Sequence, residues 1–138
     1  MIYEPKWKSL MATTVGPLFT PAQCQEISDI ANQRKAEKAL VGLKREGKGG
    51  AYDVKKRITT VRWIPFSAMT HLYKIIERSM QQVNANHFGY EGMTITEAAQ
   101  FTEYPKGGFY GWHMDAEVNS QHEPPVRKIS MTILLSDP

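Results

Sequence analysis

The sequence predicts an α+β or mostly-β plan in which helices come first and consecutive strands follow. In the N-terminal part of the 138-residue chain, apolar residues recur at helical spacing, most clearly after Ser67. From Met93 onward, apolar and polar residues alternate instead, which is typical of strands with one buried face. This change of period is the main basis for the predicted fold class.

Length and composition indicate a single domain, residues 1–138. A chain of this length with 41% hydrophobic residues can build one core but not two ordinary ones. Charged residues make up 22%, which argues against a disordered chain. The one cysteine, Cys24, excludes an internal disulfide and fits a reducing compartment. No apolar run approaches a membrane span and no signal-peptide pattern opens the chain, so we expect a cytoplasmic protein.

Much of the basic excess behind the net charge of +3 lies in residues 44–57. Four glycines between Gly42 and Tyr52 favour a solvated loop for this segment over a patch for nucleic acid or an acidic partner. The segment therefore gives little support to a nucleic-acid partner.

The first expected helix begins after Thr20. Thr20 has the character of an N-cap, Pro21 suits the first helical position, and Gln23 completes a capping box. Phe19 and Cys24 are expected to form a hydrophobic staple across this start. The buried stripe of the helix is expected to comprise Cys24, Ile27 and Ala31.

A strand and a second helix are expected next. Residues 54–64 contain strand-forming side chains and end at Pro65. Ser67 is the expected N-cap of the helix, and His71 falls off its apolar face and is expected to be exposed. The core-facing stripe of this helix is expected to be Met69, Leu72, Tyr73, Ile76, Met80 and Val83.

The C-terminal part is expected to consist of strands. Residues 93–104 alternate and predict one long strand, followed by a turn over 104–108 and an extended segment over 109–115. Residues 127–136 predict a last strand. Its apolar face is expected to carry Ile129, Met131, Ile133 and Leu135.

A His-x-Asp pair, His113 and Asp115, lies in the extended segment. Side chains two residues apart on a strand point to the same side. An imidazole nitrogen and a carboxylate oxygen could then occupy adjacent corners of one metal's coordination shell. Such donors suit iron(II) and supply two thirds of a two-histidine, one-carboxylate triad. The pair alone is a weak signal, because it arises by chance in many chains of this length.

The surroundings of the pair form a longer ordered pattern. A tyrosine, a glycine turn, aromatic residues, His-x-Asp, a variable loop, and an arginine with serine three positions on follow one another. In this chain these are Tyr104, Gly107-Gly108, Phe109-Tyr110, His113-Met114-Asp115, Arg127 and Ser130. The pattern resembles that of the prolyl-4-hydroxylase-like branch of the 2-oxoglutarate- and iron(II)-dependent oxygenases, and residues 18–24 resemble that family's approach to its first helix.

The resemblance implies a fold, a chemistry and residue roles. The fold is a double-stranded β-helix of about eight strands, a relative of the jelly roll, with residues 1–92 as helical support and 93–138 as the first core strands. The chemistry is hydroxylation of a peptide or small molecule, coupled to decarboxylation of 2-oxoglutarate to succinate, with ascorbate as an allowed accessory cofactor. His113 and Asp115 are the implied iron ligands, and Tyr104 the implied hydroxyl donor to 2-oxoglutarate.

Two further residues, Tyr110 and Arg127, match positions that line the substrate side in this family. By residue type alone, Tyr110 could equally be a half-buried sheet residue and Arg127 a surface ion-pair partner. Leu134 departs from the family pattern, in which a tyrosine is common at that place, so the co-substrate pocket is expected to be built differently.

Two parts of such a site cannot be assigned: a second histidine on a later strand, and a Lys or Arg for the distal carboxylate of 2-oxoglutarate. His122 lies in a loop bounded by Glu123-Pro124-Pro125 and is better explained as an exposed loop residue. Because the sequence ends at Pro138, where this fold would turn into its next strand, we expect it to be part of a longer protein.

Two other functions stay open. A non-catalytic jelly-roll-like binding or structural domain would carry the incomplete triad without turnover. An oxidative demethylase of nucleic-acid bases would use the basic segment 44–57, although the spacing from Tyr104 to Arg127 favours the hydroxylase type. Neither the substrate nor the oligomeric state follows from the sequence.

Overall fold

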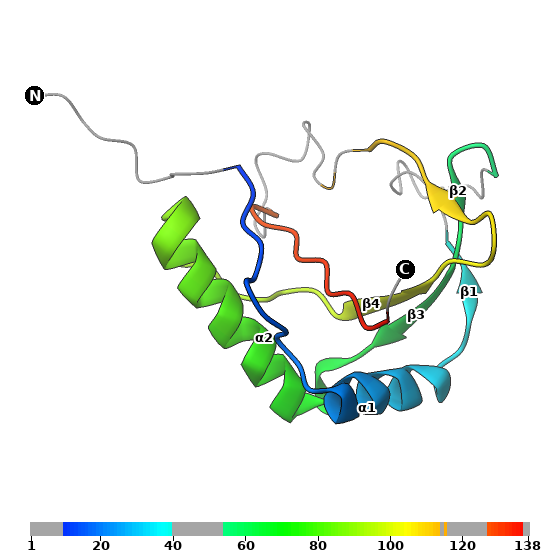
Figure 1. The fold of residues 1–138 in the computed structure, drawn as a ribbon, viewed down its shortest axis with the longest axis horizontal. Helices are drawn as coiled ribbons and strands as arrows, with labels where there is room; N and C mark the ends of the chain where they lie inside the picture. The colour runs from blue at the N-terminus through cyan, green and yellow to red at the C-terminus, as the bar shows by residue number, and fades with distance from the viewer. Residues whose placement is uncertain (1–9, 40–53, 114, 116–126, 137–138) are drawn as a thin grey trace, which may run out of the picture.

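The computed structural model describes residues 10–39, 54–113, 115 and 127–136. Two α-helices pack against one end of a narrow antiparallel ribbon of strands (Figure 1). The helices are α1 (Pro21–Asn32) and α2 (Thr70–Val83); a 3-10 turn, η1 (Phe66–Ala68), precedes α2 and a π-helical turn, η2 (Asn84–Phe88), follows it. The strands are β1 (Glu37–Lys38), β2 (Arg57–Ile58), β3 (Thr60–Ile64), β4 (Ala99–Glu103) and β5 (Phe109–Tyr110). The predicted α+β class is confirmed, whereas these residues show two small sheets and not a double-stranded β-helix.

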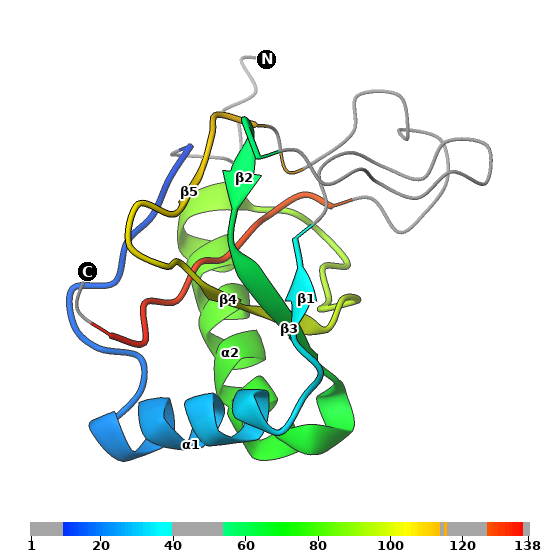
Figure 2. The ribbon, with the colours of Figure 1, turned by 90° about the vertical axis from the view of Figure 1, so that its right-hand side faces the viewer.

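The two sheets are joined through β2 and β3, which follow each other in the chain with one residue between them. The larger sheet has the order β1-β3-β4 and the smaller pairs β2 with β5, all antiparallel. Ile58 lies opposite Phe109, and Thr60 lies opposite Glu103. The single residue Thr59 on one side therefore faces the five residues 104–108 on the other, which leave the ladder as an excursion. Figure 2 shows β2 and β5 at the end of the ribbon that points away from α1.

The excursion is a tight turn, as predicted for residues 104–108. The Gly108 N–H donates to the Pro105 carbonyl at 2.6 Å, and Gly107 has a φ of 77°. A Cβ atom on Gly108 would lie 2.8 Å from the Ile58 carbonyl oxygen, so only glycine fits against β2 here.

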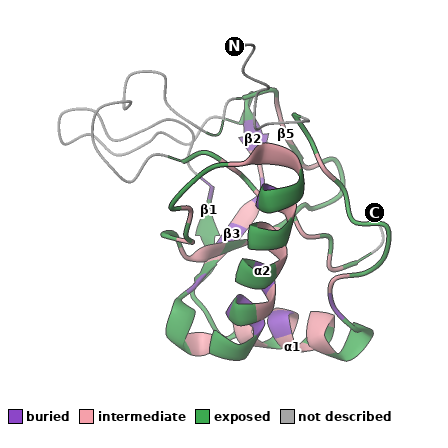
Figure 3. Cartoon of the chain, turned by 90° about the vertical axis from the view of Figure 1, so that its left-hand side faces the viewer, coloured by how far each residue is buried: buried purple, intermediate pink, exposed green. Residues whose placement is uncertain are grey.

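The core lies between the two helices and β3 (Figure 3). Its buried side chains are Phe19, Ile27, Ala31, Ile64, Met69, Leu72, Tyr73 and Ile76. The predicted stripes of both helices are thus confirmed at their central positions, with Cys24 and Met80 packed partly buried at the margin. Within the described parts, neither helix has the length and apolar run that a membrane crossing needs.

The start of α1 follows the predicted capping box. The Thr20 hydroxyl accepts the Gln23 N–H at 3.3 Å, and the Gln23 side-chain oxygen accepts the Thr20 N–H at 2.9 Å. The start of α2 differs from the prediction. Ser67 lies inside η1, and Met69 is the N-cap without a side-chain cap bond. The reason is tertiary, because burial of Met69 in the core sets where the helix begins.

Tyr73 joins α2 to the sheet. Its hydroxyl donates to the Ile64 carbonyl at 2.5 Å and accepts the Ala99 N–H at 2.6 Å. Desolvation by burial raises the pKa of the Tyr73 phenol, with the Ala99 hydrogen bond partly opposing that rise. The phenol therefore fixes the ends of β3 and β4 to the helix in its neutral form.

Two predicted strands are shorter or different. The strand expected over 93–104 is limited to β4, because its partner β3 ends at Ile64, opposite Ala99, and Pro65 follows. Residues 127–136 form no strand ladder with the described residues. Their alternation is nevertheless real, since three side chains pack on the core while those between them are exposed. The three packed side chains are Met131, Ile133 and Leu135.

Candidate functional site

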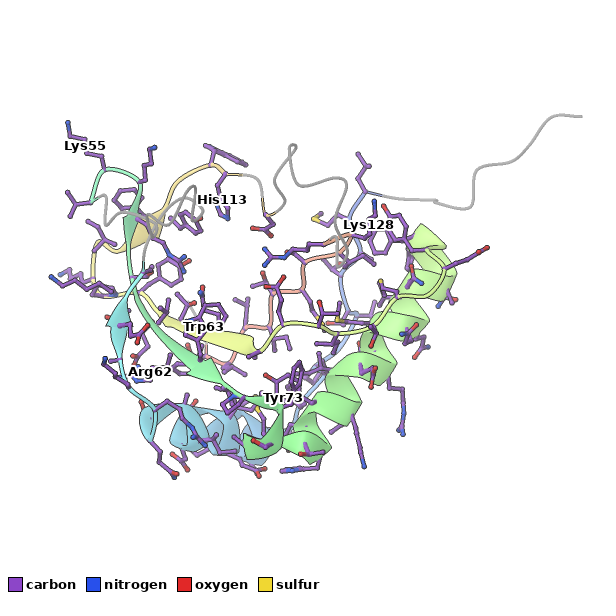
Figure 4. The ribbon with its side chains drawn as sticks, turned by 180° about the vertical axis from the view of Figure 1, so that it is seen from behind. Lys55, Arg62, Trp63, Tyr73, His113 and Lys128 are labelled. Atoms are coloured by element: carbon purple, nitrogen blue, oxygen red, sulfur yellow. The ribbon has the colours of Figure 1, made fainter. Side chains whose placement is uncertain are left out.

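The His-x-Asp pair lies just after β5, in an open surface hollow lined by Tyr110, Gly111, Trp112, His113 and Asp115. Figure 4 shows His113 near the strands β2 and β5, with Tyr73 among the helices at a distance from it. The backbone before His113 is fixed by β2. Tyr110 pairs with Arg57 in the ladder, and the Gly111 N–H donates to the Lys56 carbonyl at 2.8 Å.

The two side chains of the pair come together, although the extended segment expected over 109–115 is limited to β5 and the pair lies beyond the strand. His113 Nε2 lies 3.0 Å from Asp115 Oδ1. Two ligands that each lie about 2.1 Å from one metal ion and subtend a right angle are roughly 3 Å apart. The pair therefore has the separation of two adjacent ligands of one ion. Their role as iron ligands stays a prediction.

The hydrogen bond of His113 Nδ1 determines which ring nitrogen of the imidazole carries a hydrogen. His113 Nδ1 lies 2.8 Å from the Gly111 carbonyl oxygen, and because a carbonyl can only accept, Nδ1 must donate. Nε2 then either is bare, so that its lone pair faces the Asp115 carboxylate, or carries a second proton. In the first case, a cation bound by both groups would relieve the repulsion between them, and in the second they form an ion pair. A backbone carbonyl on the second nitrogen is also the usual support of a metal-binding histidine.

Asp115 is held ionised. A hydrogen bond from the Ser130 side chain lowers the pKa of the Asp115 carboxyl most. Partial burial opposes it as the second-largest effect, and the charges of a protonated His113 and of Arg127, together with a hydrogen bond from His113, lower the pKa further. The carboxylate is therefore charged at neutral pH, which binding a metal ion requires.

Arg127 contacts the backbone of Asp115 and the side chain of Glu97. Its Nη1 donates to the Asp115 backbone carbonyl at 2.7 Å, and its Nε donates to Glu97 at 3.2 Å within an ion pair. The surface ion pair that residue type allows is confirmed. A substrate contact by Arg127 stays a prediction.

The two tyrosines are placed differently. The Tyr110 ring lines the hollow and stacks on the His113 imidazole, with centroids 3.6 Å apart and planes 15° apart. Tyr104 lies on the excursion over 104–108, is 54% exposed and does not line the hollow. The structure thus brings Tyr110 into the site and leaves Tyr104 outside it. His122 falls outside the described residues.

Arg57 is the residue that the sequence analysis missed. It falls in both the basic segment 44–57 and the strand expected over 54–64 and has no predicted role, yet it is 6% exposed and its guanidinium carbon lies 4.3 Å from the centroid of the Tyr110 ring. The available signal was its parity. Arg57, Thr59 and Val61 are each two positions apart along β2 and β3, so their side chains lie on one face, and all three are buried.

The described parts of the chain contain no group of three or more His, Cys, Asp or Glu side chains that could hold a metal ion. Comparisons with models of known protein families, with curated proteins and with solved structures found no match to this chain.

Proposed function

We propose that His113 and Asp115 bind iron(II), and that the whole domain is a 2-oxoglutarate-dependent hydroxylase of the double-stranded β-helix type. The observation that carries the proposal is the 3.0 Å approach of Nε2 and Oδ1, combined with an Nδ1 committed to the Gly111 carbonyl. A bare Nε2 next to a charged carboxylate is stabilised by a cation that both groups share. The third protein ligand, a histidine, has to come from outside the described residues.

The residues of this chain would hold and orient the ion. Gly111 selects the imidazole tautomer that leaves Nε2 free for the metal. Ser130 and Arg127 hold the Asp115 carboxylate and backbone from the segment 127–136. Bound together with 2-oxoglutarate, iron(II) would let dioxygen hydroxylate a peptide or a small molecule, with succinate and carbon dioxide as the co-products.

A non-catalytic domain is the second candidate, and one observation favours it. The His113 and Asp115 side chains are 36% and 48% exposed, and 3.0 Å is also an ordinary distance for an ion pair with a doubly protonated imidazole. In that case a proton would take the place of the metal ion. The pair would then only fix the chain after β5.

Metal titration separates the two candidates. Calorimetric titration with Mn(II), as an air-stable substitute for iron(II), is expected to show saturable binding of one ion. His113→Ala should weaken that affinity by more than about tenfold, because even loss of an outer support of a metal ligand costs that much. His71→Ala is the matched control, since His71 Nε2 lies 2.9 Å from Glu26 on the helices.

The outcomes are distinct. Loss of binding in His113→Ala alone supports the proposal, and succinate release from 2-oxoglutarate with iron(II) would extend it to turnover. Absence of saturable binding in the unchanged protein, or equal losses in the two alanine variants, would overturn the metal site and leave the ion-pair interpretation.

A further inference from the structure

Arg57 is a buried cation in an unusual environment. It is 6% exposed, and its partners among the described residues are neutral. Its Nε donates to the Thr59 hydroxyl at 2.8 Å, and its Nη2 donates to the Gln100 side-chain oxygen at 2.8 Å. Burying a guanidinium without a carboxylate is unfavourable unless other groups compensate for its lost hydration. The third compensating group is the π-face of Tyr110.

The Tyr110 ring lies between Arg57 and His113. The guanidinium carbon is 4.3 Å from the ring centroid and the imidazole centroid is 3.6 Å from it. Groups this close to one centroid cannot share a face without overlapping, so the phenol ring separates the two. Thr59 and Gln100 fix the guanidinium, the guanidinium fixes the ring, and the ring forms a flat wall for the imidazole.

We infer that Arg57 is a positioning residue for His113, acting through the Tyr110 ring. This inference rests on the proposed function for its purpose, while the geometry it describes exists without a metal. The stack sets the plane of the imidazole, and the Gly111 carbonyl sets its rotation by holding Nδ1. Together, these two restraints orient the imidazole so that Nε2 points toward Asp115. Arg57 does not line the hollow, so it acts on the ring and not on a bound ligand.

Both restraints come from the end of β2. The Gly111 N–H bonds to the Lys56 carbonyl at 2.8 Å, and Arg57 pairs with Tyr110 in the ladder. Residues 56–57 therefore organise a metal ligand more than fifty positions later in the chain. Such rigid support raises metal affinity, because less conformational freedom is lost when the ion binds.

The first test uses the metal-free protein and NMR. The aromatic stack should shift the His113 imidazole proton signals upfield, and the nitrogen signals should report a hydrogen on Nδ1. Arg57→Met and Tyr110→Leu are expected to remove the upfield shift, whereas Tyr110→Phe keeps the ring and should preserve it. Arg57→Lys keeps the charge but lacks the planar fork that covers the ring, so it should lose most of the shift.

The second test measures Mn(II) affinity in the same variants. Arg57→Met and Tyr110→Leu should each weaken binding by about 10- to 100-fold, as loss of an outer support of a ligand does. The double variant should match Tyr110→Leu within about twofold, because Arg57 has no route to His113 once the ring is gone. Arg62→Met, in the neighbouring strand β3, is the control and should bind as the unchanged protein does.

The results separate this inference from the proposed function. If Arg57→Met and Arg57→Lys fold and both retain the upfield shift, the inference is overturned, whatever the metal does. If the unchanged protein shows the shift but binds no Mn(II), the proposed function fails while the positioning of His113 by Arg57 stands. Fully additive losses in the double variant would also overturn the inference, because they would show that Arg57 acts independently of the ring.

Discussion

Two histidine–carboxylate pairs in different regions of the molecule have nearly the same separation. His71 in α2 lies 2.9 Å from Glu26 in α1, and His113 after β5 lies 3.0 Å from Asp115. Their surroundings differ. The His113 ring is stacked and bonded at its second nitrogen, whereas among the described residues the His71 ring has only Glu26 as a partner. Separation alone therefore does not define a candidate site; the restraint around the pair does.

The comparison extends to the two regions that carry these pairs. The helical region contains the hydrophobic core, and its side chains decide whether the chain folds. The strand region, here the open hollow that follows β5, carries the His113–Asp115 pair proposed to bind a metal ion. Changes in the first region should alter stability, and changes in the second should alter metal affinity.

The largest effect is expected from Leu72→Ala in the helical region. Leu72 is fully buried between the helices and β3, so truncation leaves a cavity and should lower the free energy of unfolding by about 2–5 kcal/mol. Urea denaturation measures the loss. Leu134→Ala, at an exposed position, should change stability by less than about 0.5 kcal/mol. Equal losses in the two variants would contradict the placement of the core.

Next comes Asp115→Asn in the strand region. The change keeps the shape but removes the charge that a metal ligand needs, so Mn(II) affinity should fall on the order of 100-fold. Glu26→Gln makes the same chemical change in the helical pair and should leave the affinity unchanged. An Asp115→Asn variant that binds the ion as well as the unchanged protein would remove Asp115 from the site.

A smaller effect is expected from Tyr73→Phe. Loss of the hydroxyl leaves the Ile64 carbonyl and the Ala99 N–H without a partner, which should cost about 1–3 kcal/mol at neutral pH. Because burial raises the pKa of Tyr73, its stabilising contribution is complete below the ordinary tyrosine pKa of about 10 and is lost as the pH rises through the higher folded value.

Denaturation across alkaline pH tests this prediction. The unchanged protein should lose stability above about pH 10 more steeply than Tyr73→Phe does. Tyr104→Phe is the matched control, because Tyr104 is an exposed tyrosine outside the core. If Tyr104→Phe flattened the alkaline stability profile and Tyr73→Phe did not, the pH dependence would belong to Tyr104 and the prediction for Tyr73 would be wrong.

The smallest effect is expected from Thr20→Ala at the start of α1. The substitution removes the oxygen that accepts the Gln23 N–H, and loss of such a cap should cost about 1 kcal/mol. Thr94→Ala, at an exposed threonine outside any helix, should be neutral. Metal affinity should stay the same in both variants, which would confirm that the two regions respond separately.

Features that depend on neighbouring residues could be predicted from the sequence. The capping box at Thr20 needs only Gln23 three positions away, and the stripes of the helices follow from their period. The alternation over 127–136 likewise predicts Met131, Ile133 and Leu135 on the core, although Ile129, expected on the same face, is not among the side chains packed there. The approach of His113 to Asp115 belongs to this class, because the two residues are only two positions apart.

Features that depend on distant partners could not be predicted. A strand ends where its partner ends, so β4 begins at Ala99 because β3 stops at Ile64. Tyr104 lies outside the hollow because the ladder leaves the five residues 104–108 unpaired at that point. Arg57 falls in both the basic segment 44–57 and the strand expected over 54–64, and its burial could not be predicted because it arises from contacts with Gln100 and Tyr110, far along the chain.

The sequence by itself determined the helices, the alternation of the strands and the local His-x-Asp pair, because each is encoded by spacing within a few residues. Only the tertiary structure decided which of these features is rigid. Arg127 and Ser130 reach Asp115 from a later segment, and Arg57 supports His113 from an earlier one. The physical reason is that orienting a side chain requires contacts on several sides, and a chain supplies those contacts only by folding back on itself.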